Sequence, residues 1–394
     1  MNQIELKWLC GSAALAAGIG CSLLLPRAAE LWPVAVTLAA LVALLGYGFA
    51  VRGWWLLTVV LAGLALAYQS TAQNERLYRE SPWLRAVRRH GASTASGVPE
   101  LRQELSRRVA AGGGHAPQLT ALNQAILLGE RKRLPAQFRQ VFVDSGAIHV
   151  FAISGLHVMV VAKILMCLAA FVFVPYRWQG AVTLPVLWGY VYLIGSPPSA
   201  VRAALMATFY FSASVVWRRP NGLIAWALAF LVVHVSDPGQ LTNVGSLFSF
   251  VVMLSLVLAS RVVRLPQRIW AKLLVLTLAA WAAGVPIAAA TFGRLTPGGI
   301  LANLVLVVTA AYSVTAGILG LLLSFVWLPL AEHLNNLAIL TTQAMVVVAS
   351  AVARLPFASV EIPPWGFFEC GGWYVALGLL AYLVRHVQDR HARL

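Results

Sequence analysis

The chain has 394 residues, of which 60% are hydrophobic and only 11% are charged, and its mean hydropathy is +0.79. Soluble domains contain about a quarter charged residues, so this composition excludes an ordinary soluble protein and predicts a polytopic membrane protein. The net charge of +16 comes mostly from basic residues that lie between the apolar segments. That placement suits membrane orientation and attraction to anionic lipid headgroups or nucleic acid.

The predicted fold class is all-α, with about 11-12 transmembrane helices, several of them broken or kinked, and short interfacial amphipathic helices. One span needs roughly 20 mostly apolar residues. Residues 8–25, 31–51 and 53–68 meet this requirement, so residues 1–68 are interpreted as N-terminal transmembrane helices. The first helix is expected to be retained, because Ala28-Ala29-Glu30 is a poor cleavage site for a signal peptidase.

Residues 69–146 differ in composition, because arginine becomes frequent, and they are interpreted as a basic extramembrane segment. Three short amphipathic helices are predicted near 99–111, 117–129 and 135–145, each with a proline at or near its start. These helices are expected to lie on the membrane surface. The residues expected to attract DNA or lipid headgroups are Arg107, Arg108, Arg131, Lys132 and Arg133.

The chain is again apolar over residues 147–388, which are interpreted as a second transmembrane domain, and residues 389–394 form a basic tail. Spans are predicted near 147–174, 180–195, 199–217, 221–235, 243–260, 269–290, 299–325, 335–353 and 370–386. Pro185 and Pro286 interrupt two of them, and Gly195-Ser-Pro-Pro-Ser199 separates two others. Broken helices at membrane depth line a cavity or are buried in protein, so these breaks suggest a pathway.

The densest polar stretch begins at His149, contains Ser154, Gly155 and His157, and ends at Lys163. If it is one continuous helix, Ser154 and His157 are neighbours at i, i+3, and His149 and Lys163 share another face. Ser154-Gly155 is expected to kink this helix. Three interpretations remain open: helix packing, the lining of a translocation path, and a serine–histidine pair in an intramembrane hydrolase.

Other polar groups occur near the starts of later spans. Ser199 and Arg202 follow the Gly195–Ser199 break, Ser249 lies in a hydroxyl-rich span start, and Asn303 follows a Pro-Gly-Gly sequence. Polar groups within spans are costly and usually face a bundle interior or a water-filled path. No acidic or histidine pair has metal-binding spacing within a span, so no metal and no cofactor are predicted.

Four blocks occur in a fixed order over residues 117–310. The first is Ile126-Leu-Leu-Gly129-Glu-Arg131 with Phe142-x-x-x-Gly146-Ala-Ile-His149-Val-Phe-Ala-Ile-Ser154-Gly155-Leu-His157-Val. The others are Pro198-Ser199-x-x-Arg202-Ala-x-x-Met206, the segment from Asp237-Pro238 to Ser249-Phe250, and Pro286 to Phe292 with Leu301-Ala302-Asn303-Leu304. Together they resemble the signature of the ComEC competence-protein family.

The resemblance implies a multi-pass channel in the cell inner (cytoplasmic) membrane that passes single-stranded DNA into the cytoplasm during natural transformation, and not an enzyme. Residues 147–388 would be its channel domain. Larger members carry an OB-like domain and a metallo-β-lactamase-like nuclease domain, and neither is expected here, so the chain resembles a short form. The implied DNA path comprises His149, Ser154, Gly155, His157, Lys163, Ser199, Arg202, Ser249 and Asn303.

The expected partners are single-stranded DNA, the lipid membrane, a periplasmic DNA receptor, a cytoplasmic motor or ssDNA-binding protein, and a separate nuclease. A motor is expected because one phosphate entering against an inside-negative potential of 100 mV costs about 2.3 kcal/mol. Two alternatives from other classes are a secondary transporter or exporter of an anionic solute or lipid-linked substrate, and an intramembrane hydrolase that uses Ser154 and His157.

Overall fold

The computed structural model describes residues 98–391, apart from residues 131–135, 151–153, 242 and 264. The predicted N-terminal spans, Arg131, Lys132 and Arg133 therefore lie outside the described residues. The described part is almost wholly helical, which confirms the all-α class. Five described helices are long and apolar enough to cross a membrane: α13 (Val244–Val262), α14 (Ile269–Phe292), α15 (Gly298–Leu323), α16 (Leu328–Ala353) and α17 (Phe367–His391). The chain is a membrane protein.

The chain divides into two compact units. The bundle unit comprises the described residues within 98–225 and 296–360, and the C-terminal unit includes the described residues within 226–295 and 361–391. The bundle unit contains α15, α16, α6 (Val98–Ala110), η1 (Gly113–His115), α7 (Pro117–Leu128), α8 (Ala136–Asp144), η3 (Ile148–Val150), α9 (Gly155–Phe171), α10 (Tyr176–Leu193) and α11 (Pro198–Val215). The C-terminal unit contains most of α12 (Gly222–Ser236), and η4 (Pro238–Leu241), α13, α14 and α17. Two short strands, β1 (Arg294–Leu295) and β2 (Val360–Glu361), pair with each other.

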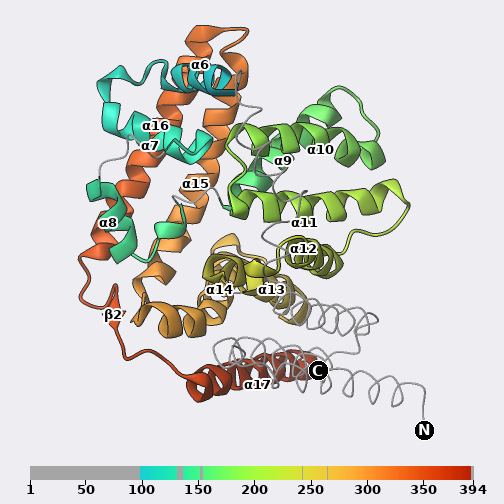
Figure 1. Ribbon diagram of the computed structural model, residues 1–394, viewed down its shortest axis with the longest axis vertical. Helices are drawn as coiled ribbons and strands as arrows, with labels where there is room; N and C mark the ends of the chain where they lie inside the picture. Colours follow the sequence, from blue (N-terminus) through green and yellow to red (C-terminus); the bar gives the residue numbers. More distant parts are fainter. Residues whose placement is uncertain (1–97, 131–135, 151–153, 242, 264, 392–394) are drawn as a thin grey trace, which may run out of the picture. The chain divides into compact units, whose positions relative to one another are not determined.

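The bundle unit is built around α15 and α16, which run side by side in opposite directions (Figure 1). Helices α6, α7 and α8 pack against this pair, whereas α9, α10 and α11 pack on one another and α9 also contacts α15. Fully buried side chains from both groups, such as Phe142, Leu187, Leu306 and Met345, belong to one hydrophobic core. The helices around residues 147–217 are therefore a tightly packed part of this unit.

The three predicted amphipathic helices are present as α6, α7 and α8, close to their expected bounds. Pro117 is at the first turn of α7, and Gly129 ends it in the left-handed conformation that favours glycine. Leu122 and Ile126, which lie four residues apart on one face of α7, are buried, and Asn123 accepts a hydrogen bond of 3.4 Å from Ser313 of α15. The apolar stripe of α7 therefore faces its neighbouring helices, and the surface location of these helices stays a prediction.

Gly146 lies in a turn that fits tightly against the start of α15. Its φ of +74° is a conformation that side chains with a Cβ rarely adopt, and a Cβ there would lie 2.7 Å from the Cβ of Thr296. Gly299 also comes close, since a Cβ on it would lie 3.3 Å from the Gly146 carbonyl oxygen. Two sequence blocks that are about 150 residues apart thus meet backbone to backbone.

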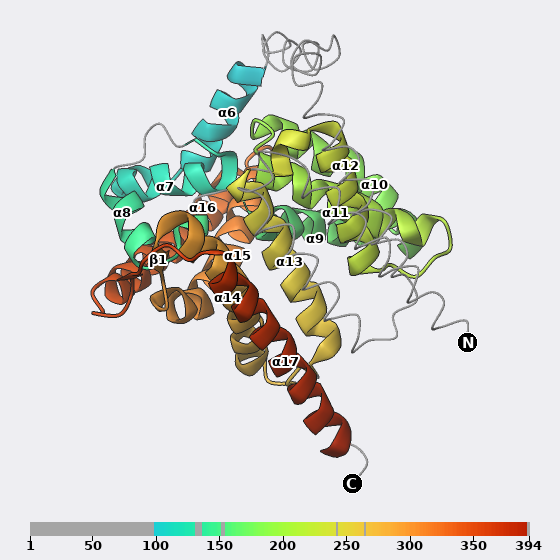
Figure 2. The same ribbon diagram turned by 60° about the horizontal axis from the view of Figure 1, so that its bottom comes forward.

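Pro185 and Pro286 do not break their spans, because α10 and α14 continue through them. In the C-terminal unit, α17 runs beside α14 (Figure 2) and explains how Pro286 is tolerated. Pro286 has no N–H to donate to the Ala282 carbonyl four residues earlier. The Trp373 indole of α17 donates to that carbonyl instead, at 2.8 Å. A neighbouring helix thus satisfies the freed backbone group, as membrane helices require.

Trp373→Phe is expected to lower the free energy of unfolding by about 1–2 kcal/mol, because it removes the indole donor and leaves the Ala282 carbonyl unpaired. Thermal unfolding of the detergent-purified chain measures this. The matched control is Trp270→Phe, since Trp270 lies at the start of α14 and is 62% exposed. Equal stability of the two variants would show that the hydrogen bond contributes nothing.

Candidate functional site

The first part of the candidate site is the start of α9. Ser154 is the N-cap residue of a helix that begins at Gly155, and it forms a capping box with His157. The Ser154 N–H donates to His157 Nδ1 at 3.1 Å, and Ser154 Oγ lies 2.8 Å from the same nitrogen. Because Nδ1 accepts, the neutral ring carries its proton on Nε2. The i, i+3 pairing predicted for these two residues is therefore confirmed.

The expectation of one continuous helix from His149 to Lys163 is wrong. His149 lies in the separate 3-10 turn η3, so it does not share a helix face with Lys163, and Ser154-Gly155 is a helix start instead of a kink. The physical reason is the capping box: a serine side chain that binds the first-turn backbone favours a helix boundary over a helix interior.

Arg202 forms the second part of the site, on α11. Its side chain is buried, with 6% of the residue exposed, and His157 is 1% exposed. Helices α9 and α11 run in the same direction, because each is joined by a short turn to α10, which lies between them in the sequence. A Cβ on Gly155 would lie 3.7 Å from the Cβ of Ala203, so the α9 start contacts α11 next to Arg202.

This arrangement favours an anion. Helix N-termini carry partial positive charge and unpaired N–H groups, and here the first turn of α9 lies beside the first two turns of the parallel helix α11. Arg202, which precedes Ala203 in the sequence, adds a full positive charge. Nε2 of His157 is buried and has no hydrogen-bond partner among the described residues, so it is available as a donor.

The other predicted path residues divide into two groups. Ser199 lies in the first turn of α11, and Asn303 lies in the first two turns of α15, where its Oδ1 has no partner within the described part of the chain. These two belong to the same unit as His157 and Arg202. Ser249 lies on α13 in the C-terminal unit. Lys163 is exposed on α9, away from the buried face that carries His157.

The Arg108 guanidinium already has partners within the protein. It donates to the Ser324 carbonyl at the end of α15 at 2.8 Å, pairs with Glu104 at 2.8 Å, and lies 4.3 Å from the centre of the Phe325 ring. A cation at a helix C-terminus stabilises the helix dipole. Arg107 is exposed and lies 3.8 Å from Glu104, so it remains accessible to an anionic partner.

Sequence reasoning missed Arg102 and Asn335. Arg102 donates to the Leu128 carbonyl at 2.6 Å and to the Ile194 carbonyl at 3.3 Å, and thereby joins the C-terminal ends of α7 and α10. Asn335 donates to the Arg108 carbonyl at 2.8 Å and caps α6 from α16. Neither residue has a local sequence signal, because every acceptor lies in another element.

The fold and the site together define a polytopic helical membrane protein with buried cationic and imidazole side chains at adjoining helix starts. A family model described as "Competence protein" matches residues 126–387, which is more than half of the chain, so the chain belongs to the competence protein family.

Individual relatives agree with this assignment. The chain is 28% identical over 208 residues to "ComE operon protein 3" of Bacillus subtilis (strain 168), which covers 52% of this chain and 27% of the relative. It is 31% identical over 183 residues to "Competence protein ComA" of Neisseria gonorrhoeae, covering 43% of this chain and 26% of that protein. The chain thus matches about a quarter of the length of these curated relatives. No solved structure matches the chain.

Proposed function

We propose that the bundle unit forms part of a path that carries single-stranded DNA across the cytoplasmic membrane during natural transformation. The observation that carries this proposal is the burial of Arg202 beside the start of α9. A buried arginine in a helical membrane protein costs free energy and is a default candidate for a substrate path. Membership of the competence protein family supports DNA as the substrate.

The path would work by lowering the barrier for a polyanion. Arg202 and the α9 start bind one backbone phosphate after another, and His157, Ser199, Asn303 and the nearby His149 supply further polar contacts. Fixed charges do not provide net work against the membrane potential. We therefore include a cytoplasmic motor or ssDNA-binding protein in the proposal, with a periplasmic DNA receptor and a nuclease supplied by other chains.

Arg202→Gln is expected to lower internalised DNA by about 10- to 100-fold, which corresponds to the roughly 1.5–3 kcal/mol of one hydrogen bond to a charged group. Arg202→Lys keeps the charge and is expected to retain most of the uptake. The measurement is the amount of labelled DNA that reaches the cytoplasm of a naturally competent host that carries the variant as its single copy.

Membrane levels of each variant are compared by immunoblot, and DNA bound at the cell surface is counted separately. Normal internalisation by Arg202→Gln at normal protein levels would refute the proposed path. Equal losses in the glutamine and lysine variants would show that the shape of the guanidinium, and not its charge, is what matters.

A second candidate is an intramembrane hydrolase, which one observation favours: Ser154 Oγ lies 2.8 Å from His157 Nδ1. The same contact belongs to the capping box, which explains it without catalysis. Labelling with a serine-reactive fluorophosphonate separates the two functions. Labelling that disappears in Ser154→Ala supports a hydrolase, and an unlabelled protein that still internalises DNA supports the path.

A further inference from the structure

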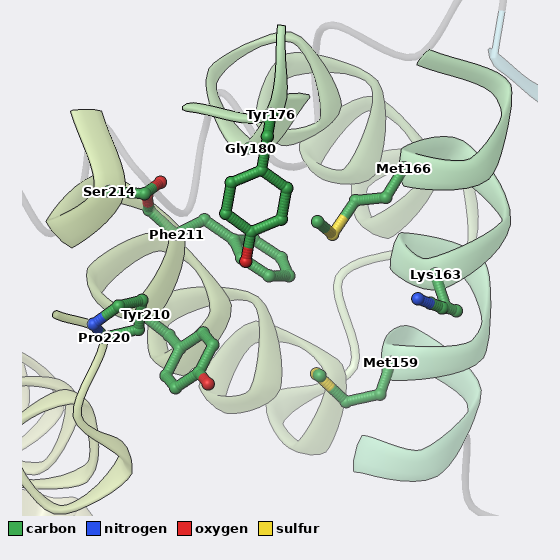
Figure 3. A pocket seen from close by; sticks show the side chains of 9 residues that line it. All are labelled: Met159, Lys163, Met166, Tyr176, Gly180, Tyr210, Phe211, Ser214 and Pro220. Atoms are coloured by element: carbon green, nitrogen blue, oxygen red, sulfur yellow. The ribbon is translucent and has the colours of Figure 1, made fainter. Parts of the chain in front are cut away.

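A pocket of about 220 Å³ lies between α9, α10 and α11, on a part of the bundle unit that the proposed DNA path does not use. Figure 3 shows Lys163 between Met159 and Met166 on α9, facing Tyr210 and Phe211 of α11. Its remaining lining residues are Tyr176, Gly180, Ser214 and Pro220. The pocket is thus mainly apolar, and its single charged group is an ammonium.

The chain just after α9 and just after α11, the two helices that line the pocket with α10, carries aromatic residues in a strained conformation. Phe173 follows the end of α9 with a φ of 60°, and Trp217 follows the end of α11 with a φ of 59°. This position usually holds glycine, because a side chain there costs about 1–3 kcal/mol. The two residues are 92% and 82% exposed. Exposed rings at helix ends are typical of the membrane–water interface.

The same helix ends are positively charged. Between Asp144 and Asp237 the sequence contains no acidic residue, but it contains Lys163, Arg177, Arg202, Arg218 and Arg219. The Arg177 guanidinium lies 4.8 Å from the centre of the Trp217 ring and 5.1 Å from that of Trp178. In the sequence, Arg177 directly follows the lining residue Tyr176, and Arg219 directly precedes the lining residue Pro220.

From this combination we infer that the α9–α11 pocket binds one anionic phospholipid. The headgroup phosphate contacts Arg177, Arg219 and the ammonium of Lys163, whose side chain extends toward the headgroup. An acyl chain of the same lipid lies along Met159 and Met166. A lysine can extend its charged end toward the interface while its methylene groups stay in apolar surroundings. Charge complementarity demands an anion, and the apolar lining demands a hydrocarbon chain attached to it.

The apolar rim favours a lipid over single-stranded DNA. Phe171, Val172 and Val216 lie at the same helix ends and are 80%, 66% and 64% exposed. A DNA strand would leave these groups in water, whereas acyl chains and glycerol groups cover them. On this assignment Lys163 binds lipid and is not part of the DNA path.

The test is native mass spectrometry of the full-length chain, purified in detergent and titrated with phosphatidylglycerol or with phosphatidylcholine. One phosphatidylglycerol is expected to remain bound in preference to phosphatidylcholine. Lys163→Gln and Arg177→Gln are each expected to weaken that binding about fivefold, since each cation near anionic lipid contributes on this scale. The matched control, Arg354→Gln, changes an exposed arginine of the same unit and is expected to leave binding unchanged.

Met159→Trp tests the acyl-chain site without a change of charge, and it is expected to remove the bound lipid from a folded protein. Equal retention of the two lipids, or equal binding by all charge variants, would overturn the inference. The pocket would be assigned to nucleic acid if a 20-nucleotide DNA strand displaced the lipid and Lys163→Gln weakened the binding of that strand. Arg202→Gln is expected to retain the lipid, so failure of the DNA path and failure of this inference are distinguishable.

Discussion

Gly146→Ala is expected to lower the free energy of unfolding by about 2–5 kcal/mol. Two costs add: about 1–2 kcal/mol for a side chain in the left-handed conformation, and about 1–3 kcal/mol for overpacking. The second cost arises because the new Cβ would lie 2.7 Å from the Cβ of Thr296 and 3.2 Å from the Cα of Gly299. Backbone at the start of α15 has little freedom to retreat, because Gly298 donates a hydrogen bond of 3.1 Å to the Ala358 carbonyl.

Denaturant unfolding of the detergent-purified chain measures this effect. Gly189→Ala is the matched control, because Gly189 lies within α10 with no atom within 4 Å of a built Cβ. That substitution is expected to raise stability by up to about 1 kcal/mol, as alanine is the better helix former. Equal effects of the two substitutions would refute the tight contact. DNA internalisation should also fall in Gly146→Ala, since the Gly146 turn precedes His149.

Arg102→Met is expected to destabilise the bundle unit by about 2–4 kcal/mol, because it removes charged hydrogen bonds from two carbonyls and keeps a side chain of similar length. The acceptors, Leu128 and Ile194, lie 26 and 92 residues away in the sequence, so a single guanidinium holds the ends of α7 and α10 together. Tyr190 adds a third link, since its hydroxyl donates to the Leu127 carbonyl at 2.9 Å. Unfolding of the purified chain and protease resistance of residues 98–225 report the loss.

The control is Arg107→Met on the same helix. The Arg107 side chain is 71% exposed and 3.8 Å from Glu104, so its removal is expected to change stability by less than about 0.5 kcal/mol. The stability of Arg102→Lys is expected to lie between those of Arg102→Met and Arg107→Met, because an ammonium keeps the charge but cannot reproduce the paired N–H donors of a guanidinium. Arg102→Met with the stability of Arg107→Met would show that the bridge between α7 and α10 is unimportant.

Arg102 and Arg107 lie on the same basic helix, but their side chains have different contacts. Both residues are arginines in one amphipathic helix of a strongly basic chain, and the sequence predicts attraction to DNA or headgroups for Arg107 and Arg108 of that helix. Structure separates them: Arg102 and Arg108 satisfy helix-end carbonyls of distant elements, and Arg107 is free to meet an anion. Composition gives the number of charged groups, but it does not show which of them already bind backbone carbonyls of the same chain.

By itself the sequence determined the membrane class, the order of the helices and the i, i+3 contact of Ser154 with His157, because length, hydropathy and helical period act locally. Tertiary structure alone decided that Trp373 supplies the donor lost at Pro286, and that Lys163 lines a pocket whereas Arg202 is buried beside the start of α9. Each of these depends on backbone groups or side chains from distant segments. Helical periodicity determines the face of a helix on which a residue lies, but only tertiary packing determines which residues contact that face.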